Sequence, residues 1–367
     1  MSALTQTDQA TALQALVIAV TARVPVLLWG GPGTGKTSAV RDLASAMNWP
    51  CEVVIASIRE PSDFGGLPVV ADGRVRFAPP DWAGRLVDAG KGILFLDEIS
   101  TAAPAVQAAL LRVVLERRVG DLALPDDVAV VAAANPPEQT ADGWDLSAPL
   151  ANRFCHLDWQ PDAAAFSEGI TAGWRKPLVQ ESRAIRKARF EAARALVAAF
   201  AIVRPNLLLL VPRDVSAAGR AWPSPRTWEM AARLYAVSED FDASGAVRTA
   251  LIAGSVGPGA AIEFLTWVAE MDLQDPEEAL TDPDTFELPA RGDRAYAALT
   301  AIAAAIAANP TPERWVTGWK LLGRAGAQSP DIAAQAARIL TRCRPGGTPL
   351  PEEIKIFLPL LESAGLA

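Results

Sequence analysis

A glycine-rich loop followed by a lysine and a threonine carries the strongest chemical signal in the chain. Residues 30–37 read Gly-Gly-Pro-Gly-Thr-Gly-Lys-Thr and fit the phosphate-binding pattern G-x-x-x-x-G-K-[ST] without a mismatch. An apolar run at 26–29 precedes the loop, and a helical pattern at 38–47 follows it. The glycines let backbone N–H groups point at an anion, and the helix adds its positive end. The residues expected to bind the phosphates are Gly31, Pro32, Gly33, Thr34, Gly35, Lys36, Thr37 and Ser38.

An acidic pair at the end of a second apolar run supplies the next signal. Residues 92–96 read as a central parallel strand that ends in Asp97 and Glu98. Ligands of open α/β sheets bind at this carboxyl edge. We expect Asp97, together with the Thr37 hydroxyl, to hold Mg²⁺, and Glu98 to orient and deprotonate an attacking water. The pattern therefore indicates hydrolysis of a nucleoside triphosphate.

Three more polar residues are candidates for the same site. Asn135 ends the apolar run 128–134 and could hydrogen-bond the γ-phosphate or the water. Arg153 could neutralise charge that develops on the γ-phosphate. Arg226 follows a Ser-Pro helix start, where a cation is unfavourable unless an anion is bound nearby. The alternative interpretations are a turn residue for Asn135 and solvated surface side chains for the two arginines.

The elements that must position these residues alternate between strands and helices up to about residue 158. This alternation predicts a doubly wound α/β core with a parallel sheet. An Asp-Gly turn between runs 67–70 and 74–77 predicts one inserted hairpin, and turn signals within 119–127 predict a second. Beyond the core the patterns are helical, with proline-rich breaks. They cover 183–203, 223–236, 264–271, 294–308, 315–322 and 332–340. We expect a core at 1–160, a helical lid at 161–290 and a helical extension at 291–367.

Composition limits the class of protein. The chain has 367 residues and a net charge of −8, which argues against a general nucleic-acid-binding protein. One histidine and three scattered cysteines argue against a zinc site or a disulfide framework. Apolar stretches too short to span a bilayer, and a polar N-terminus, favour a cytoplasmic protein without a membrane segment. Residues 175–226 hold eleven Lys and Arg against three acids; a solvated face, an acidic neighbouring subunit and nucleic acid are the candidate explanations.

The order of these motifs resembles that of AAA+ ATPases. Residues 30–37 match the Walker A motif, 93–98 the Walker B motif, Asn135 sensor 1, Arg153 the arginine finger and Arg226 sensor 2. The segments 96–100 and 134–136 are similar to those of the MoxR group, and both hairpins stand where that group carries insertions. Two departures concern the turn after Asn135, which reads Pro-Pro-Glu-Gln, and Asn152, which stands where the group usually has an acid.

The resemblance implies an ATP- and Mg²⁺-dependent AAA+ ATPase that forms an oligomer, a hexameric ring. Such proteins remodel or mature a protein partner that often contains a von Willebrand factor A domain. We expect Arg153 to reach the nucleotide of a neighbouring subunit, with Arg117 and Arg118 as the next candidates for the finger. The alternatives are a nucleic-acid-associated motor similar to clamp loaders, and an ATP-gated scaffold that does not hydrolyse ATP.

Overall fold

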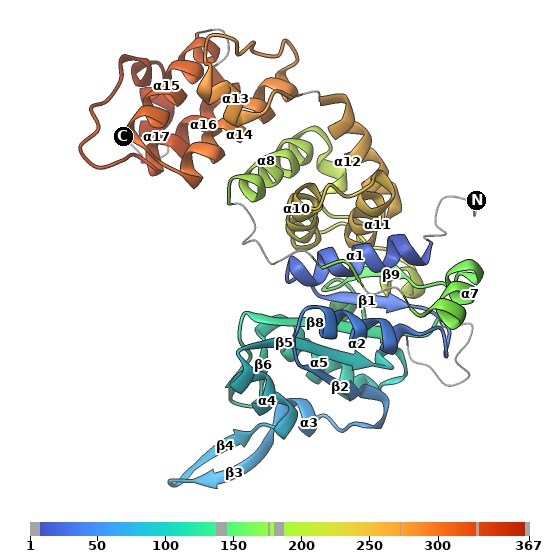
Figure 1. Cartoon of the computed structure of the whole chain (residues 1–367). Helices are drawn as coiled ribbons and strands as arrows, with labels where there is room; N and C mark the ends of the chain where they lie inside the picture. The colour runs from blue at the N-terminus through green and yellow to red at the C-terminus, as the bar shows by residue number, and fades with distance from the viewer. Residues whose placement is uncertain are drawn as a thin grey trace. The chain divides into compact units, whose positions relative to one another are not determined.

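The computed structural model describes residues 8–136, 145–174, 177–179, 187–271, 273–327 and 330–363 (Figure 1). Contacts between residues divide the chain into two compact units: 1–182 with 208–262, and 183–207 with 263–367. The expected three parts, with boundaries at 160 and 290, stay a prediction. The turn at 137–139 lies outside the described residues. So do four residues of the basic stretch: Arg175, Lys176, Arg183 and Arg186.

A five-stranded parallel sheet forms the centre of the first unit (Figure 1). Its order is β2-β5-β8-β1-β9, and the strands are β1 (Val26–Trp29), β2 (Cys51–Ile55), β5 (Lys91–Asp97), β8 (Asp127–Ala134) and β9 (Cys155–Asp158). Trp29 is in register with both Ala134 and Asp158, and Ile55 with Asp97, so the strands end at a common edge. The expected doubly wound α/β fold is confirmed.

Both faces of this sheet are covered, which explains why its three central strands, β5, β8 and β1, are largely continuous apolar runs. Leu94 and Leu96 belong to a core cluster with side chains from α4, α5 and α6, whereas Ile93 and Phe95 are buried outside that cluster. Contacts with the strands also come from α1 and α2. The bounds are α1 Gln9–Thr21, α2 Lys36–Ala46, α4 Asp81–Ala89, α5 Pro104–Glu116 and α6 Ala148–Ala151.

Both predicted hairpins are present, and they are bonded to each other. The first is β3 (Leu67–Ala71) with β4 (Arg74–Ala78), after the short α3 (Ser62–Gly65); the second is β6 (Arg118–Val119) with β7 (Leu122–Ala123). Asp121 donates its N–H to the carbonyl of Phe77 at 3.0 Å and accepts the Phe77 N–H at 2.9 Å. A Cβ on Gly66 would lie 2.8 Å from the Cα of Gly120, so this contact requires glycine. The second hairpin thereby braces the base of the first.

Short and medium helices complete the first unit. They are α7 (Ala163–Ala172), α9 (Val215–Ala218), α10 (Pro225–Asp240) and α11 (Gly245–Val256). The helix α11 packs against α10, α1 and β9. A Cβ on Gly254 would lie 2.3 Å from the carbonyl oxygen of His156, so a glycine lets α11 approach the edge strand closely. The segment that carries Arg226 is therefore packed onto the sheet unit.

The second unit is helical and has its own core. It contains α8 (Lys187–Val203), α12 (Pro258–Met271) from Glu263 onward, α13 (Pro276–Thr281), α14 (Gly292–Ala308), α15 (Pro312–Gly326), α16 (Pro330–Arg342) and α17 (Leu358–Ser363). Trp315, Trp319 and Phe357 are fully buried in this core. No helix in the described parts of the chain is both long and apolar enough to cross a membrane. The cytoplasmic location stays a prediction.

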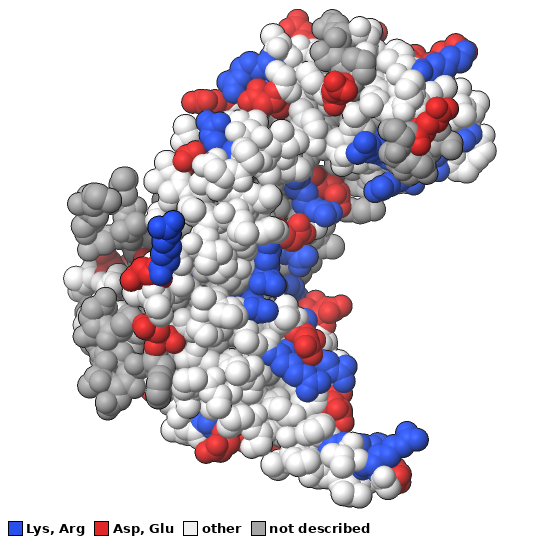
Figure 2. Space-filling view, turned by 180° about the vertical axis from the view of Figure 1, so that it is seen from behind, with Lys and Arg blue, Asp and Glu red and all other residues white. Residues whose placement is uncertain are grey.

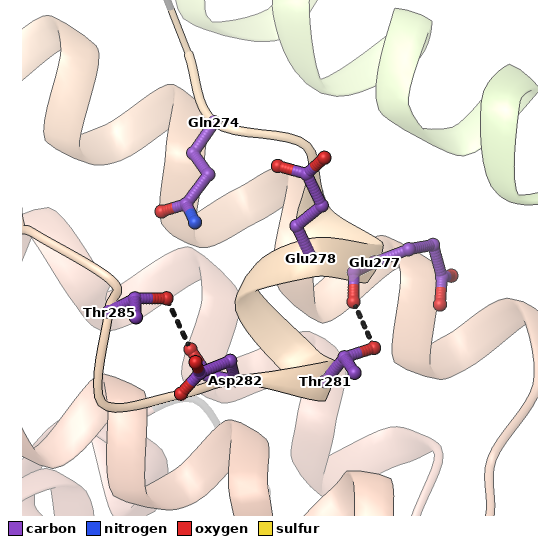
Figure 3. Close-up of a pocket in the computed structure, with 6 residues that line it drawn as sticks. All are labelled: Gln274, Glu277, Glu278, Thr281, Asp282 and Thr285. Atoms are coloured by element: carbon purple, nitrogen blue, oxygen red, sulfur yellow. Dashed lines mark hydrogen bonds between the residues drawn. The ribbon is translucent and has the colours of Figure 1, made fainter.

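A shallow depression on α13 and the turn after it is lined by acidic and polar side chains (Figure 3). Its Glu277 is paired with Arg314 at 2.6 Å, and its Thr281 donates a hydrogen bond to the carbonyl of Glu277. None of the residues expected to bind phosphate or catalyse hydrolysis lines it. The lining residues are Gln274, Glu277, Glu278, Thr281, Asp282 and Thr285.

Candidate active site

The glycine-rich loop connects β1 to α2 at the carboxyl edge of the sheet. Gly33 and Gly35 adopt left-handed φ angles of 75° and 87°, which glycine tolerates without strain. A Cβ on Gly30 would lie 2.4 Å from the carbonyl oxygen of Trp159, so the loop can pass β9 only with glycine there. The Trp159 indole also donates to the carbonyl of Thr34 at 3.0 Å. The residue that follows β9 thus holds the loop in place.

Lys36 lies in the first turn of α2 and is only 7% exposed. Its ammonium donates to the carbonyl of Gly31 at 2.9 Å and to the Asn135 amide oxygen at 3.1 Å. Burial lowers the pKa of Lys36, while the charges of Asp97 and Glu98 oppose that shift. The expected phosphate-binding lysine therefore lies beside the end of β8, within reach of two acidic groups.

Thr37 and Asp97 form a pair of oxygen donors suited to Mg²⁺. The Thr37 hydroxyl donates to Asp97 Oδ2 at 2.9 Å, across the gap between α2 and β5. Among the described residues, His, Cys, Asp and Glu side chains never gather in a group of three or more that could hold a metal. Two oxygen donors fit Mg²⁺, because this ion usually takes one or two carboxylates and completes its shell with water and substrate phosphates.

Glu98 has an unusual backbone conformation. Its φ of 56° and ψ of 39° lie in the left-handed region, which costs a residue with a side chain about 1–2 kcal/mol. The N–H of Glu98 donates to Asp97 Oδ1 at 3.0 Å, and its carboxylate accepts a hydrogen bond from the Ser57 hydroxyl. Ser57 follows β2, the neighbour of β5, and was not among the expected site residues. The carboxylate is thus held by a side chain from the next strand.

Asn135 is held by a second serine that the sequence analysis did not identify. The buried Ser100, just after β5, lies 3.3 Å from the Asn135 N–H and donates to the Asn135 carbonyl at 3.4 Å. The backbone at the end of β8 is therefore tied to the Asp97 segment. Four expected residues, Lys36, Thr37, Asp97 and Asn135, come together at one sheet edge.

Arg153 and Arg226 form a separate group. Arg153 is half-buried and donates to the carbonyl of Pro149; its pKa is lowered first by burial and then by the charge of Arg226. Within the described ranges, neither arginine has a hydrogen bond or ion pair with the phosphate-binding loop. Arg117 donates to the carbonyls of Pro125, which follows the second hairpin, and of Val128 in β8, whereas Arg118 donates to the carbonyl of Asp121 in the turn of that hairpin. Both alternative candidates for the arginine finger are therefore bonded to the backbone of their own chain.

The only histidine is structural. The Trp29 indole donates to Nδ1 of His156 at 2.9 Å, so the ring proton lies on Nε2, which donates to the carbonyl of Ala151 at 2.9 Å. Burial lowers the pKa of His156 to about 4. A neutral ring with both nitrogens bonded braces β1 against β9 and α6, and takes no part in proton transfer at neutral pH.

Comparisons with known proteins agree with this arrangement. Residues 25–154 match the model of the AAA domain of the dynein-related subfamily. Protein MoxR of Paracoccus denitrificans is 35% identical over 113 residues, 30% of this chain and 32% of that protein. The Nif-specific regulatory protein of Sinorhizobium fredii is 37% identical over 128 residues, 32% of this chain and 21% of that protein. The chain thus spans about a third or less of these relatives.

A crystal structure from Cytophaga hutchinsonii is similar over 68% of this chain and 81% of that chain, with 20% identity and a TM-score of 0.46. A likeness at this level carries no functional argument. The family match covers the loop, the strand ending in Asp97, Asn135 and Arg153. Residues 25–154 are therefore similar, over about a third of the chain, to the AAA domain of the dynein-related subfamily and to the matching part of Protein MoxR.

Proposed function

We propose that the AAA domain binds ATP with Mg²⁺ and hydrolyses it. The observation that carries this proposal is the convergence of two side-chain pairs at the carboxyl edge of the sheet. Thr37 and Asp97 lie 2.9 Å apart, and Lys36 and Asn135 lie 3.1 Å apart. An ammonium, a carboxylate, a hydroxyl and an amide at one edge match the requirements of a triphosphate with its metal.

Each residue has a role that follows from its chemistry. Lys36 exchanges bonds to Gly31 and Asn135 for bonds to the β- and γ-phosphates, and Asn135 then orients the attacking water. Thr37 and Asp97 hold Mg²⁺, which neutralises charge on the phosphate oxygens. Glu98 takes the proton of the water as general base. The hydrogen bond that the Glu98 carboxylate accepts from Ser57 must break or change its geometry before Glu98 can take this proton.

We further propose that the active form is a ring, a hexamer by family resemblance, in which Arg153 acts on a neighbour's nucleotide. The support is that Arg153, at the end of α6, has no described bond to the loop of its own chain. If so, Arg153→Ala and Glu98→Gln are each inactive alone. Mixing them restores activity, because some interfaces combine an intact Glu98 with an intact Arg153. An inactive mixture with demonstrated co-assembly would refute action between subunits.

The partner is proposed to be a protein, with a von Willebrand factor A domain as the first candidate from the MoxR resemblance. The β3–β4 hairpin supports a protein contact, because its apolar side chains are exposed: Val70 by 80%, and Leu67 and Val75 by 61% each. The same hairpin carries two exposed arginines, Arg74 and Arg76, and Figure 2 shows basic side chains at this end of the first unit. Apolar side chains interleaved with arginine are typical of protein interfaces.

A nucleic-acid-associated motor is the competing function, and an ATP-gated scaffold is the third. In the basic stretch, Arg194, Arg204 and Arg220 are each within 3.4 Å of a carboxylate, which reduces the charge available for phosphates. Measuring ATP turnover with a von Willebrand factor A domain protein, and with DNA at 50 and 200 mM salt, separates the three. Stimulation by protein at both salts supports the proposal. Salt-sensitive stimulation by DNA supports the motor, and no turnover supports the scaffold.

A further inference from the structure

Asn152, the residue that replaces the expected acid, uses both halves of its amide. Asn152 is buried, with 3% of its surface exposed. The amide nitrogen donates to the carbonyl of Trp222 at 3.2 Å, and the amide oxygen accepts from the Ser224 hydroxyl at 2.8 Å. A carboxylate could accept the second bond but could not donate the first. An asparagine at this position therefore fits a contact that an ionised acid would break.

The partner of Asn152 fixes the start of α10. Ser224 is the N-cap residue, and its hydroxyl accepts the Thr227 N–H at 3.2 Å. The Thr227 hydroxyl accepts the Ser224 N–H at 2.8 Å, which completes a capping box. Arg226 stands in the turn that these bonds define. The position of Arg226 thus depends on a cap that is itself bonded to Asn152.

Arg153 follows Asn152 directly in the chain and is close enough to Arg226 for their charges to interact. Two guanidinium groups repel each other, so their proximity is unfavourable when no anion lies between them. The Nε of Arg153 is buried, and among the described residues it has no hydrogen-bond partner. The two bonds of Asn152 directly connect the segment of Arg153 with the residues at the start of α10.

We propose that Asn152 is a positioning residue that fixes the spacing of Arg153 and Arg226, so that the two cations act on phosphate as one unit. This inference rests on the proposed ATPase function for its kinetic consequence. The contact itself is independent of that function. A misplacement of about 1 Å away from the reacting atoms can cost a hundredfold in rate. We therefore expect Asn152→Ala to lower kcat by about ten- to a hundredfold with little change in KM.

The contact can be tested without catalysis by hydrogen exchange of the backbone amides. In Asn152→Ala, the amides of the first turn of α10 should exchange at least tenfold faster than in the wild type. The first turn of α11 is the internal reference, because its N-cap Ser244 accepts the Val247 N–H at 3.3 Å without a bond to Asn152. If exchange in α10 is unchanged, or rises equally in α11, the proposed link is refuted.

A double-mutant cycle tests the coupling. In an Arg226→Ala background, Asn152→Ala should change kcat less than about threefold, because residues that act through one contact are not additive. Ser224→Ala removes the hydrogen bond between Ser224 and Asn152 by deleting its donor. If Asn152→Ala folds poorly, Ser224→Ala should show the same loss of kcat. Ser244→Ala removes a comparable helix cap and should lower stability by a similar amount with kcat unchanged.

Full additivity of the Asn152 and Arg226 substitutions would make Asn152 a stability residue and refute the proposal. So would an equal loss of kcat in Ser244→Ala. A wild-type protein that does not hydrolyse ATP would instead refute the proposed function. In that case the exchange measurement alone decides whether Asn152 fixes the start of α10.

Discussion

Replacing Lys36 by alanine removes an ammonium that the structure places against the loop. In the wild type it is bonded to the carbonyl of Gly31 and to Asn135, at 2.9 and 3.1 Å. A hydrogen bond to a charged group contributes roughly 1.5–3 kcal/mol. Because the lysine must give up existing bonds to engage the phosphates, we expect the lower half of this range, about 2 kcal/mol. This corresponds to roughly thirtyfold weaker ATP binding.

The assay is a titration of purified protein with fluorescent analogues of ATP, ADP and AMP. ATP and ADP should bind more weakly to Lys36→Ala, whereas AMP, which lacks the β- and γ-phosphates, should bind as before. Lys91→Ala is the matched control, because Lys91 begins the strand that Asp97 ends, about 20 Å away at the opposite sheet edge. ATP affinity within threefold of the wild type, or an equal loss for AMP, would show that the triphosphate does not lie against Lys36.

Three further predictions concern other parts of the first unit. Ser57→Ala frees the Glu98 carboxylate, so basal ATP turnover should rise several-fold; a fall would mean that Ser57 orients Glu98 productively. The pKa of His156 is about 6.5 in the unfolded chain and is lowered to about 4 in the folded protein. Between these two pH values the unfolded state therefore binds a proton that the folded state does not bind. The contribution of His156 to the free energy of unfolding should therefore fall by about 3 kcal/mol from pH 6.5 to 4; urea denaturation of His156→Gln should show a smaller fall than the wild type, and an equal fall would contradict the assignment. Shortening the hairpin turn at 71–73 should abolish stimulation by a protein partner and leave basal turnover intact; equal loss of both would make the hairpin structural.

The fold and the centre of the site were predictable because they depend on local patterns. The apolar runs that end at Asp97 and just before Asn135 indicate the ends of two strands, and in a parallel sheet these ends lie at the same carboxyl edge. The Asp-Gly turn predicted the first hairpin for a similarly local reason. Strand β9 was missed: it is four residues long, reads Cys-His-Leu-Asp, and carries little apolar signal.

Contacts between side chains that are far apart in the sequence could not be predicted from local patterns. Ser57 donates a hydrogen bond to Glu98, which has a left-handed backbone conformation, and no local pattern indicates either feature. Asn152, just after α6, accepts a hydrogen bond from Ser224, 72 residues later in the chain, and no local sequence pattern indicates that these two residues are neighbours. Asn152 was noticed only as a departure from the usual acid, and its purpose follows from the partners that the fold gives it.

The most direct test of the central claim is the nucleotide found on Glu98→Gln after incubation with ATP and Mg²⁺. Glutamine keeps the shape of the side chain and can still accept the Ser57 hydrogen bond, but it cannot take a proton from water. Chromatography of the nucleotide released by denaturation should give ATP from Glu98→Gln and mostly ADP from the wild type. ADP formation by Glu98→Gln at a rate within twofold of the wild type would contradict the assignment of Glu98 as general base.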